Sequence, residues 1–230
     1  MPDHLVFTLS AAIGSMGDVA GHERRGTMLR PGRSAVLGLV AAALGLKRDD
    51  AEGLAALESL KLAVAVHDAG EPLRDYHTVQ TIPSNVVKRP DSRRAAFKAA
   101  KGRENTTVTQ RDYRTDPLFA VALWGGDALL ARISLALAHP TFCLWLGRKS
   151  CPLSAPTAPV IVEATGPIDA LAHARLPPWR SGVVADMVAS DPAPGISGRI
   201  ERRHDQVRDR AAWHFSARDV VIVALGGEDR

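Results

Sequence analysis

An uncharged apolar run over residues 35–46 constrains the fold of this 230-residue chain more than any other feature. Ser34 precedes the run as a candidate helix N-cap and Gly45 follows as a helix stop, which predicts a helix over residues 35–44. Apolar side chains surround nearly the whole helix, so we expect it to be buried against a sheet. The twelve residues of the run fall well short of the roughly 20 that a membrane-spanning helix needs.

Strand-forming segments flank this helix in an order that is typical of one fold. Alternating or continuous apolar residues predict four strands, over residues 5–9, 61–67, 118–124 and 142–146. Two more helices are expected near residues 50–57 and, capped by Asp127 and ended by Pro140, over residues 127–138. Residues 14–33 follow neither period, and we expect Phe7 and Phe119 to lie in the core. The order β-α-β, long insertion, β-α-β predicts an α+β, ferredoxin-like (RRM-like) fold.

A proline-rich stretch at residues 152–159 predicts a boundary between two parts of the chain. Strand candidates follow it, at residues 160–164, 183–188 and 220–225. We therefore expect a ferredoxin-like domain over residues 1–156, with an insertion at about 79–112. A smaller β-rich region over residues 157–230 would pack on that domain.

Composition narrows the function classes. Cys143 and Cys151 form no CxxC pair, which disfavours both a zinc site and a disulfide framework. Neither a Walker loop, a dinucleotide fingerprint nor an HExxH motif is present, so we expect no cofactor and no metal. No Lys or Arg precedes Arg24, so we expect no signal peptide and a soluble, cytoplasmic protein with no membrane partner.

The positive charge is concentrated in one insertion between the second and third predicted strands. Residues 86–105 hold seven basic and two acidic side chains, while the whole chain has a net charge of only +4. The segments 78–82 and 106–109 on either side are strand-like and could pair as the stem of a hairpin. A stemmed basic hairpin favours contacts with RNA phosphates, although a solvated loop remains the alternative.

Two further basic groups are weaker candidates for anion binding. Arg24, Arg25, Arg30 and Arg33 precede the buried helix, and Arg33 and Ser34 lie at its N-terminus, where free N–H groups favour an anion. A plain N-cap with solvated arginines is an equally good interpretation. The loop 147–150, with Arg148 and Lys149, follows the fourth predicted strand and could cradle a phosphate. Residues 199–210 hold five arginines, but three acidic residues offset them, and we expect this run to form a solvated face.

A metal-independent ribonuclease is the alternative function. Such an enzyme needs a base, an acid and a cation near the scissile phosphate, and His77, Tyr76 and Lys149 could supply them. His22 is a weaker candidate of the same kind. A buried, hydrogen-bonded His–Tyr pair is the more common explanation for His77 and Tyr76.

Four ordered motifs resemble the CasD family of the CRISPR-associated RAMP superfamily. They are the segments at residues 33–50 (RSAVLGLVAAALGLKRDD), 73–79 (LRDYHTV), 109–124 (TQRDY followed by FAVALW) and 146–153 (LGRKSCPL). The loop after the first strand lacks the family's usual proline and tryptophan, and Pro31-Gly32-Arg33-Ser34 replaces the family's Pro-Thr-Lys/Arg-Ser. The resemblance covers roughly residues 5–156 and is loose beyond them.

The resemblance implies a non-catalytic subunit of the type I-E Cascade complex that holds the 5′ handle of the CRISPR RNA. It also implies a palm with a hairpin thumb, and contacts with the CasC backbone and the large subunit CasA. The subunit would contact target DNA only indirectly, through the complex. In a related subtype the CasD-like subunit is itself the endoribonuclease. The candidate RNA-binding residues are Arg24, Arg25, Arg33, Ser34, Lys88, Arg89, Arg93, Arg94, Lys98, Lys101, Arg103, Arg111, Arg148 and Lys149.

Overall fold

The computed structural model describes residues 1–21, 23–209, 212 and 214–225. The helices are α1 (Arg33–Leu44), α2 (Ala51–Glu58), α3 (Arg93–Ala100), α4 (Asp127–Ala138), α5 (Pro167–Leu171) and the 3-10 turn η1 (Pro178–Arg180). The strands are β1 (Asp3–Ser10), β2 (Ile13–Gly14), β3 (Met16–Ala20), β4 (Arg24–Met28), β5 (Lys61–Asp68), β6 (Glu71–Thr81), β7 (Asn105–Thr115), β8 (Leu118–Trp124), β9 (Val160–Glu163), β10 (Met187–Ser190), β11 (Arg199–Asp209) and β12 (His214–Ala224). The mixed α+β class expected from the sequence is confirmed.

A seven-stranded antiparallel sheet in the order β11-β12-β10-β5-β8-β1-β9 forms the body. Its central strands β1, β5 and β8 are the predicted strands at residues 5–9, 61–67 and 118–124. They are covered on both faces, which explains why they are almost continuously apolar. One predicted strand is wrong, because residues 142–146 form a loop with a single bridge from Trp145 to Pro152. The strand that pairs with the outer edge of β1 is β9 instead.

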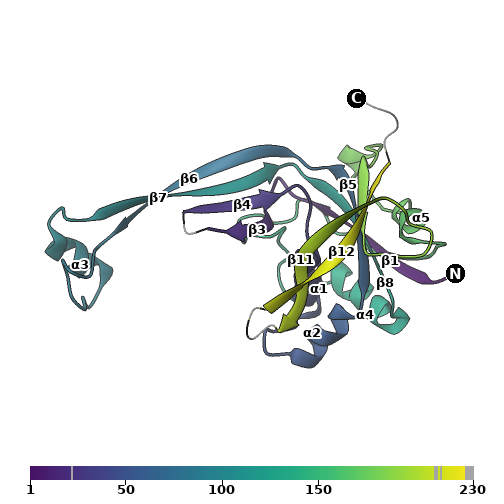
Figure 1. Cartoon of the computed structure of the whole chain (residues 1–230), viewed down its shortest axis with the longest axis horizontal. Coiled ribbons are helices and arrows are strands. Elements are labelled where there is room, and N and C mark those ends of the chain that lie inside the picture. The colour runs from purple at the N-terminus through teal and green to yellow at the C-terminus, as the bar shows by residue number, and fades with distance from the viewer. Residues whose placement is uncertain (22, 210–211, 213, 226–230) are drawn as a thin grey trace.

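Two apolar clusters lie on opposite faces of this sheet. On one face, Leu5, Phe7 and Phe119 pack with α1, α2 and α4, and both phenylalanines are fully buried as expected. On the other face, Val6 packs with Ala170 and Leu171 of α5. In Figure 1, α2 and α4 lie in the lower part of the body and α5 lies on the right. The apolar helix predicted from the sequence is therefore buried against a sheet, as α1.

The strands beyond residue 160 extend the same sheet that β1, β5 and β8 form. The segment expected at residues 183–188 is strand only from Met187, as β10, and the one expected at 220–225 is the end of the longer β12. The expected division into residues 1–156 and 157–230 stays a prediction.

Three helix and loop details differ from the sequence interpretation. The N-cap of α1 is Gly32 without a side-chain cap, so Ser34 lies inside the helix, whereas Gly45 ends α1 in the left-handed conformation as expected. Asp127 is the first residue of α4 and Gly126 is the cap. Residues 14–33 are not irregular, because they contain β3 and β4 and part of β2. These strands are too short to display a period.

A second sheet, in the order β2-β7-β4-β3 with β6 on β7, carries a long hairpin. Strands β6 and β7 pair without a register shift from Glu71 opposite Thr115 to Thr81 opposite Asn105. We call residues 71–115 the hairpin arm. Figure 1 shows that it projects far from the body and carries α3 at its tip. No helix of the described residues is long and apolar enough to cross a membrane.

Candidate nucleic-acid interface

The tip of the hairpin arm gathers the predicted basic insertion on a folded support. The stem predicted at residues 78–82 and 106–109 is confirmed, since Thr78 pairs with Val108 and Gln80 with Thr106. The sequence analysis missed α3, although Ser92 gives the signal: its hydroxyl caps the helix by accepting from the Ala95 N–H. All seven basic residues of the tip are exposed: Lys88, Arg89, Arg93, Arg94, Lys98, Lys101 and Arg103.

Two of these cations also hold the tip together. The Arg93 guanidinium donates to the Gln80 carbonyl at 2.7 Å and lies 4.9 Å from the centre of the Phe97 ring. Arg103 donates to the Ala100 carbonyl at 3.3 Å. Arg93 therefore links α3 to the end of β6, and its donors are partly occupied.

A second basic group lies where the arm joins the body, and no single segment of the sequence contains it. Arg24 of β4 donates from Nε and Nη2 to Asp112 Oδ2 at 3.1 and 2.9 Å. Arg74 of β6 donates from Nε to Asp112 Oδ1 at 2.7 Å. The two arginines thus share one carboxylate of β7. We call Arg24, Arg74 and Asp112 the hairpin-base cluster.

The contact between Arg74 and Asp112 shifts the pKa values of both groups. The hydrogen bond from Arg74 is the largest influence that lowers the pKa of Asp112, and the same bond raises the pKa of Arg74. The cluster therefore places two guanidinium groups against one carboxylate. Because Arg24 and Arg74 are 62% and 41% exposed, a ligand can reach both guanidinium groups.

Arg148 lies against the same part of β7 but has a different role. Its guanidinium donates to the backbone carbonyls of Asp112 and Arg25 at 3.1 and 3.0 Å, and lies 4.6 Å from the centre of the buried Tyr113 ring. Burial would raise the pKa of Tyr113, but Ser150 and Arg148 outweigh that effect and lower the pKa. Arg148 therefore joins β4 to β7, whereas Lys149 is exposed beside Trp145.

The loop that carries Arg148 is held by one close backbone approach. Ser15 donates its N–H to the Leu146 carbonyl at 3.0 Å, and Gly147 follows with φ of 92°. A Cβ atom at Gly147 would lie 1.6 Å from the Ser15 carbonyl oxygen. Only glycine fits there, which explains its place before Arg148.

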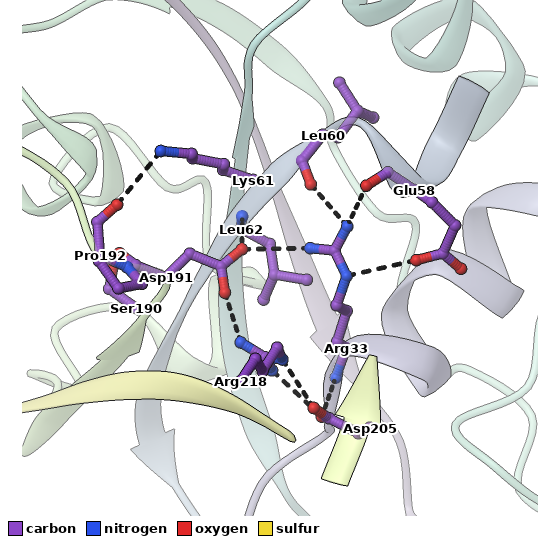
Figure 2. A network of polar contacts seen from close by, with 10 residues as sticks. All are labelled: Arg33, Glu58, Leu60, Lys61, Leu62, Ser190, Asp191, Pro192, Asp205 and Arg218. Carbon is purple, nitrogen blue, oxygen red and sulfur yellow. Dashed lines mark hydrogen bonds and ion pairs between the residues drawn. The ribbon is translucent and has the colours of Figure 1, made fainter. Parts of the chain in front are cut away.

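Arg33, expected at an anion site, is instead the centre of a buried network (Figure 2). Its guanidinium is 5% exposed and contacts Asp191 at 3.1 Å, Glu58 at 3.4 Å and the Leu60 carbonyl at 2.8 Å. Arg218 bridges Asp191 and Asp205 on the C-terminal strands. The side chain of Arg33 thus faces the protein interior and is not available to RNA.

The N-terminus of α1 already has an anion, and it belongs to the protein. Asp205 Oδ2 accepts from the Arg33 N–H at 3.1 Å, and Arg218 donates to both carboxylate oxygens of Asp205. Burial would raise the pKa of Asp205, but the Arg218 hydrogen bond and the Arg33 N–H outweigh it and lower the pKa. The sequence analysis expected residues 199–210 to form a solvated face. Asp205 differs, because it binds Arg218 and the N-terminus of α1.

The alternative catalytic residues are not assembled in one place. His77 Nε2 contacts the Asp75 carboxylate, not Tyr76, and Tyr76 is 61% exposed. A buried, hydrogen-bonded His–Tyr pair, the more common explanation for these two residues, is therefore wrong. His77 and Tyr76 are neighbours on β6, so their side chains point to opposite faces. Among the described residues no cluster of His, Cys, Asp or Glu could hold a metal ion, and His22 lies outside them.

Two of the remaining candidates, Arg25 and Arg111, lie beside the hairpin-base cluster. Arg25 is exposed on β4, and Arg111 pairs in register with Arg25 and with Asp75. Ser34 is exposed in the first turn of α1, on the body of the protein. The structure thus brings Arg24, Arg25, Arg111 and Arg148 together and leaves Arg33 and Ser34 apart from them. The sequence analysis missed Arg74 because Asp112, the carboxylate that it binds, is 38 positions away.

Comparison with known proteins decides the family. The profile of the family described as CRISPR-associated protein (Cas_Cas5) matches residues 4–221. The chain belongs to this Cas5 family. A curated Cas5 relative, the CRISPR system Cascade subunit CasD of Escherichia coli (strain K12), is 32% identical over 183 residues, which cover 74% of this chain and 76% of the relative. The resemblance to the CasD family expected from the sequence is confirmed.

Two solved structures share the Cas5 fold. A chain described as part of a CRISPR RNA-guided surveillance complex superposes with a TM-score of 0.67 at 24% identity, over 96% of this chain and 89% of the other. A crystal structure of a Cas protein superposes with a TM-score of 0.61 at 26% identity, over 96% and 94% of the two chains. Since both matches cover nearly the whole chain, the likeness includes the arm as well as the body.

Proposed function

We propose that this protein is a non-catalytic, RNA-binding subunit of a type I-E Cascade complex that holds the 5′ handle of the CRISPR RNA. Membership of the Cas5 family and the identity to a Cascade subunit support this proposal. The observation that carries it is the exposed basic tip of the hairpin arm, which projects beyond the body (Figure 1). Such a tip can reach the phosphates of a strand that lies along the arm.

The body of the protein is, in this proposal, a ferredoxin-like RAMP palm. Four strands of the large sheet follow the order β9-β1-β8-β5, with all neighbours antiparallel. Helix α1 lies between β1 and β5 in sequence, and α4 lies between β8 and β9. This is the arrangement that a split βαβ unit requires, and the hairpin arm is then the thumb inserted between its second and third strands.

The proposed partners follow from the same assignment. Besides the RNA handle, we expect contacts with the CasC backbone, which this subunit would cap, and with CasA. Target DNA would be contacted only through the complex. The long hairpin arm is suited to contacts with other subunits, because much of its surface lies away from the body of the protein (Figure 1).

A binding role fits the described site better than endoribonuclease activity. His77 contacts Asp75, and Tyr76 and His77 point to opposite faces of β6. A general acid and a general base must both reach the reacting group, which these positions do not favour. Cleavage of repeat RNA therefore remains the alternative that the experiment must test.

The deciding experiment uses the purified protein with two labelled RNAs, the cognate 5′ handle and a scrambled handle of equal length. We expect tighter binding of the cognate handle at physiological salt, and no cleavage of repeat RNA in the presence of a chelator. Equal affinity for both RNAs would overturn handle recognition. Specific cleavage that is lost in His77→Ala would establish the enzyme instead.

A further inference from the structure

We infer that the hairpin-base cluster and Tyr76 form a subsite for one nucleotide of the bound RNA, with the phosphate between Arg24 and Arg74 and the base against the Tyr76 ring. This inference rests on the proposed function and names a contact region apart from the basic tip. It also gives Tyr76 a stacking role in place of a catalytic one.

The site is a hollow at the base of the arm. Its volume is about 260 Å³, and its walls come from β4, β6 and β7. Arg24, Arg74 and Asp112 line it. The lining of the hollow therefore carries a net positive charge.

The two arginines keep donors for a ligand while Asp112 holds them in place. A guanidinium carries five N–H donors on a planar fork, and each arginine contacts Asp112 through Nε and Nη2. The N–H groups of each Nη1 are not needed for those contacts. Because Arg24 and Arg74 come from different strands and meet at one carboxylate, they present a fixed pair of cations to a phosphate.

Tyr76 lies at the right place to receive a base. Arg74 and Tyr76 are two positions apart on β6, so their side chains share a face of the hairpin at a spacing of roughly 7 Å. The Tyr76 hydroxyl lies near enough to Arg74 to contribute to its raised pKa, and the side chain is 61% exposed. An exposed aromatic ring beside a cation pair is the usual platform for a nucleotide of a single strand.

The strand register places the cluster and Tyr76 on the same face of the second sheet. Arg74 is opposite Asp112, and Tyr76 is opposite Gln110, which itself pairs with Arg24 of β4. Opposite residues share a face, so Arg24, Arg74, Asp112 and Tyr76 are on one side of the sheet. Tyr113 also lines the hollow, but its ring is buried beneath the Arg148 guanidinium, which leaves Tyr76 as the exposed ring beside the cluster.

The test measures binding of the handle RNA to three variants and one control. We expect Arg74→Gln to weaken binding about tenfold and to reduce the slope of log affinity against log salt by about 0.7, the value for one phosphate contact on a single strand. Tyr76→Leu should weaken binding about 5- to 100-fold, whereas Tyr76→Phe, which keeps the ring, should bind like the wild type. Arg132→Gln, an exposed arginine on α4, is the matched control and should change nothing.

A spectroscopic signal separates stacking from a structural effect. Handle RNAs that carry 2-aminopurine at successive positions should show one position whose fluorescence is quenched by the wild type and by Tyr76→Phe, and not by Tyr76→Leu. Thermal unfolding of each variant checks that the fold is retained.

Each outcome separates this inference from the proposed function. If the wild type discriminates the handle and Arg74→Gln and Tyr76→Leu bind as tightly with an unchanged salt slope, the subsite is wrong and the function stands. If Arg74→Gln binds RNA normally but no longer assembles with CasC, the cluster binds a protein carboxylate, which also overturns the subsite. Failure of the wild type to discriminate the handle overturns the proposed function itself.

Discussion

Arg180 of η1 donates to the carboxylate of Asp68 at 2.6 Å, although the two residues are 112 positions apart. The same guanidinium contacts Asp116 Oδ2 at 2.5 Å. Asp68 ends β5 just before the arm begins, and Asp116 follows the last residue of the arm. One side chain from the C-terminal part of the protein therefore ties both ends of the hairpin arm to the body.

The first prediction concerns this clamp. Arg180→Ala should lower the free energy of unfolding by less than about 1 kcal/mol, because both carboxylates are partly exposed. The orientation of the arm should nevertheless become broader. The measurement is energy transfer between a dye on the exposed Cys143 and a dye on Ser84→Cys at the tip, since Cys151 is buried.

We expect a wider distribution of transfer efficiency in Arg180→Ala and weaker handle binding by severalfold. Arg175→Ala, an exposed arginine nearby in the chain, is the control and should leave the distribution unchanged. An unchanged distribution in Arg180→Ala would show that other contacts suffice to orient the arm. Those would include Arg114, which donates to the Ala69 and Gly70 carbonyls.

The second prediction concerns the tip. Simultaneous change of Lys88, Arg94 and Lys98 to Gln removes three exposed cations, and spares Arg93 because its donors support α3. The slope of log affinity against log salt should fall by about 2, since each phosphate contact to a single strand contributes about 0.7. Preference for the cognate handle should barely change, because phosphate contacts carry no sequence information. The matched control changes the exposed Lys47, Arg48 and Arg132 to Gln. If the tip variant and this control have the same slope of log affinity against log salt, the tip is solvated and does not contact the RNA.

The third prediction separates two neighbours in one loop. Arg148→Gln should lower the free energy of unfolding by about 1–2 kcal/mol and impair handle discrimination, because it removes the stacking on Tyr113 and two carbonyl contacts. Arg148→Lys should not restore either property, since an ammonium group lacks the planar fork. Lys149→Gln should change only affinity and its salt dependence. Urea unfolding and binding of both handles provide the measurements, and full function in Arg148→Lys would contradict the structural role.

The fourth prediction concerns the buried network in Figure 2. Asp191 accepts from the Leu62 N–H at 2.9 Å and contacts Arg33 and Arg218. Asp191→Ala should cost about 3–5 kcal/mol in urea unfolding, because it leaves the buried Arg33 without its main counter-charge. The exposed Asp49→Ala is the control and should stay within about 0.5 kcal/mol of the wild type. A loss equal to that of the control would show that the network is not stabilising.

The fifth prediction follows from the lowered pKa of Asp205. A carboxylate whose pKa is lower in the folded protein stabilises the fold fully above its ordinary pKa, about 3.9, and loses that contribution as the pH falls through the folded value. The wild type should therefore lose stability below about pH 4 more steeply than Asp205→Asn. Chemical unfolding at a series of pH values between 6 and 2.5 measures this, with the exposed Asp219→Asn as the control. Parallel curves for the wild type and Asp205→Asn would contradict the prediction.

The sequence by itself determined the elements whose signal lies within a short segment of the chain. The apolar helix α1, the central strands β1, β5 and β8, the buried Phe7 and Phe119 and the stem of the basic hairpin all follow from periodicity, turn residues and charge within short windows. The family itself was predicted from the four motifs that resemble the CasD family, and not from the composition of any single segment.

Only the tertiary structure decided which strand completes the sheet and which charges meet. Residues 142–146 have the apolar pattern of a strand, yet β9 pairs with β1 because register and chain path, and not local preference, select the partner. The sequence around Arg33 does not distinguish it from a solvated arginine. In the structure its guanidinium binds Asp191, 158 positions away, and its backbone N–H binds Asp205, 172 positions away, in the interior. Arg24, Arg74 and Asp112 likewise become one cluster only when β4, β6 and β7 lie side by side. Long-range pairs of this kind leave no periodic trace in the chain, because their energy depends on distance in space and not on separation in sequence.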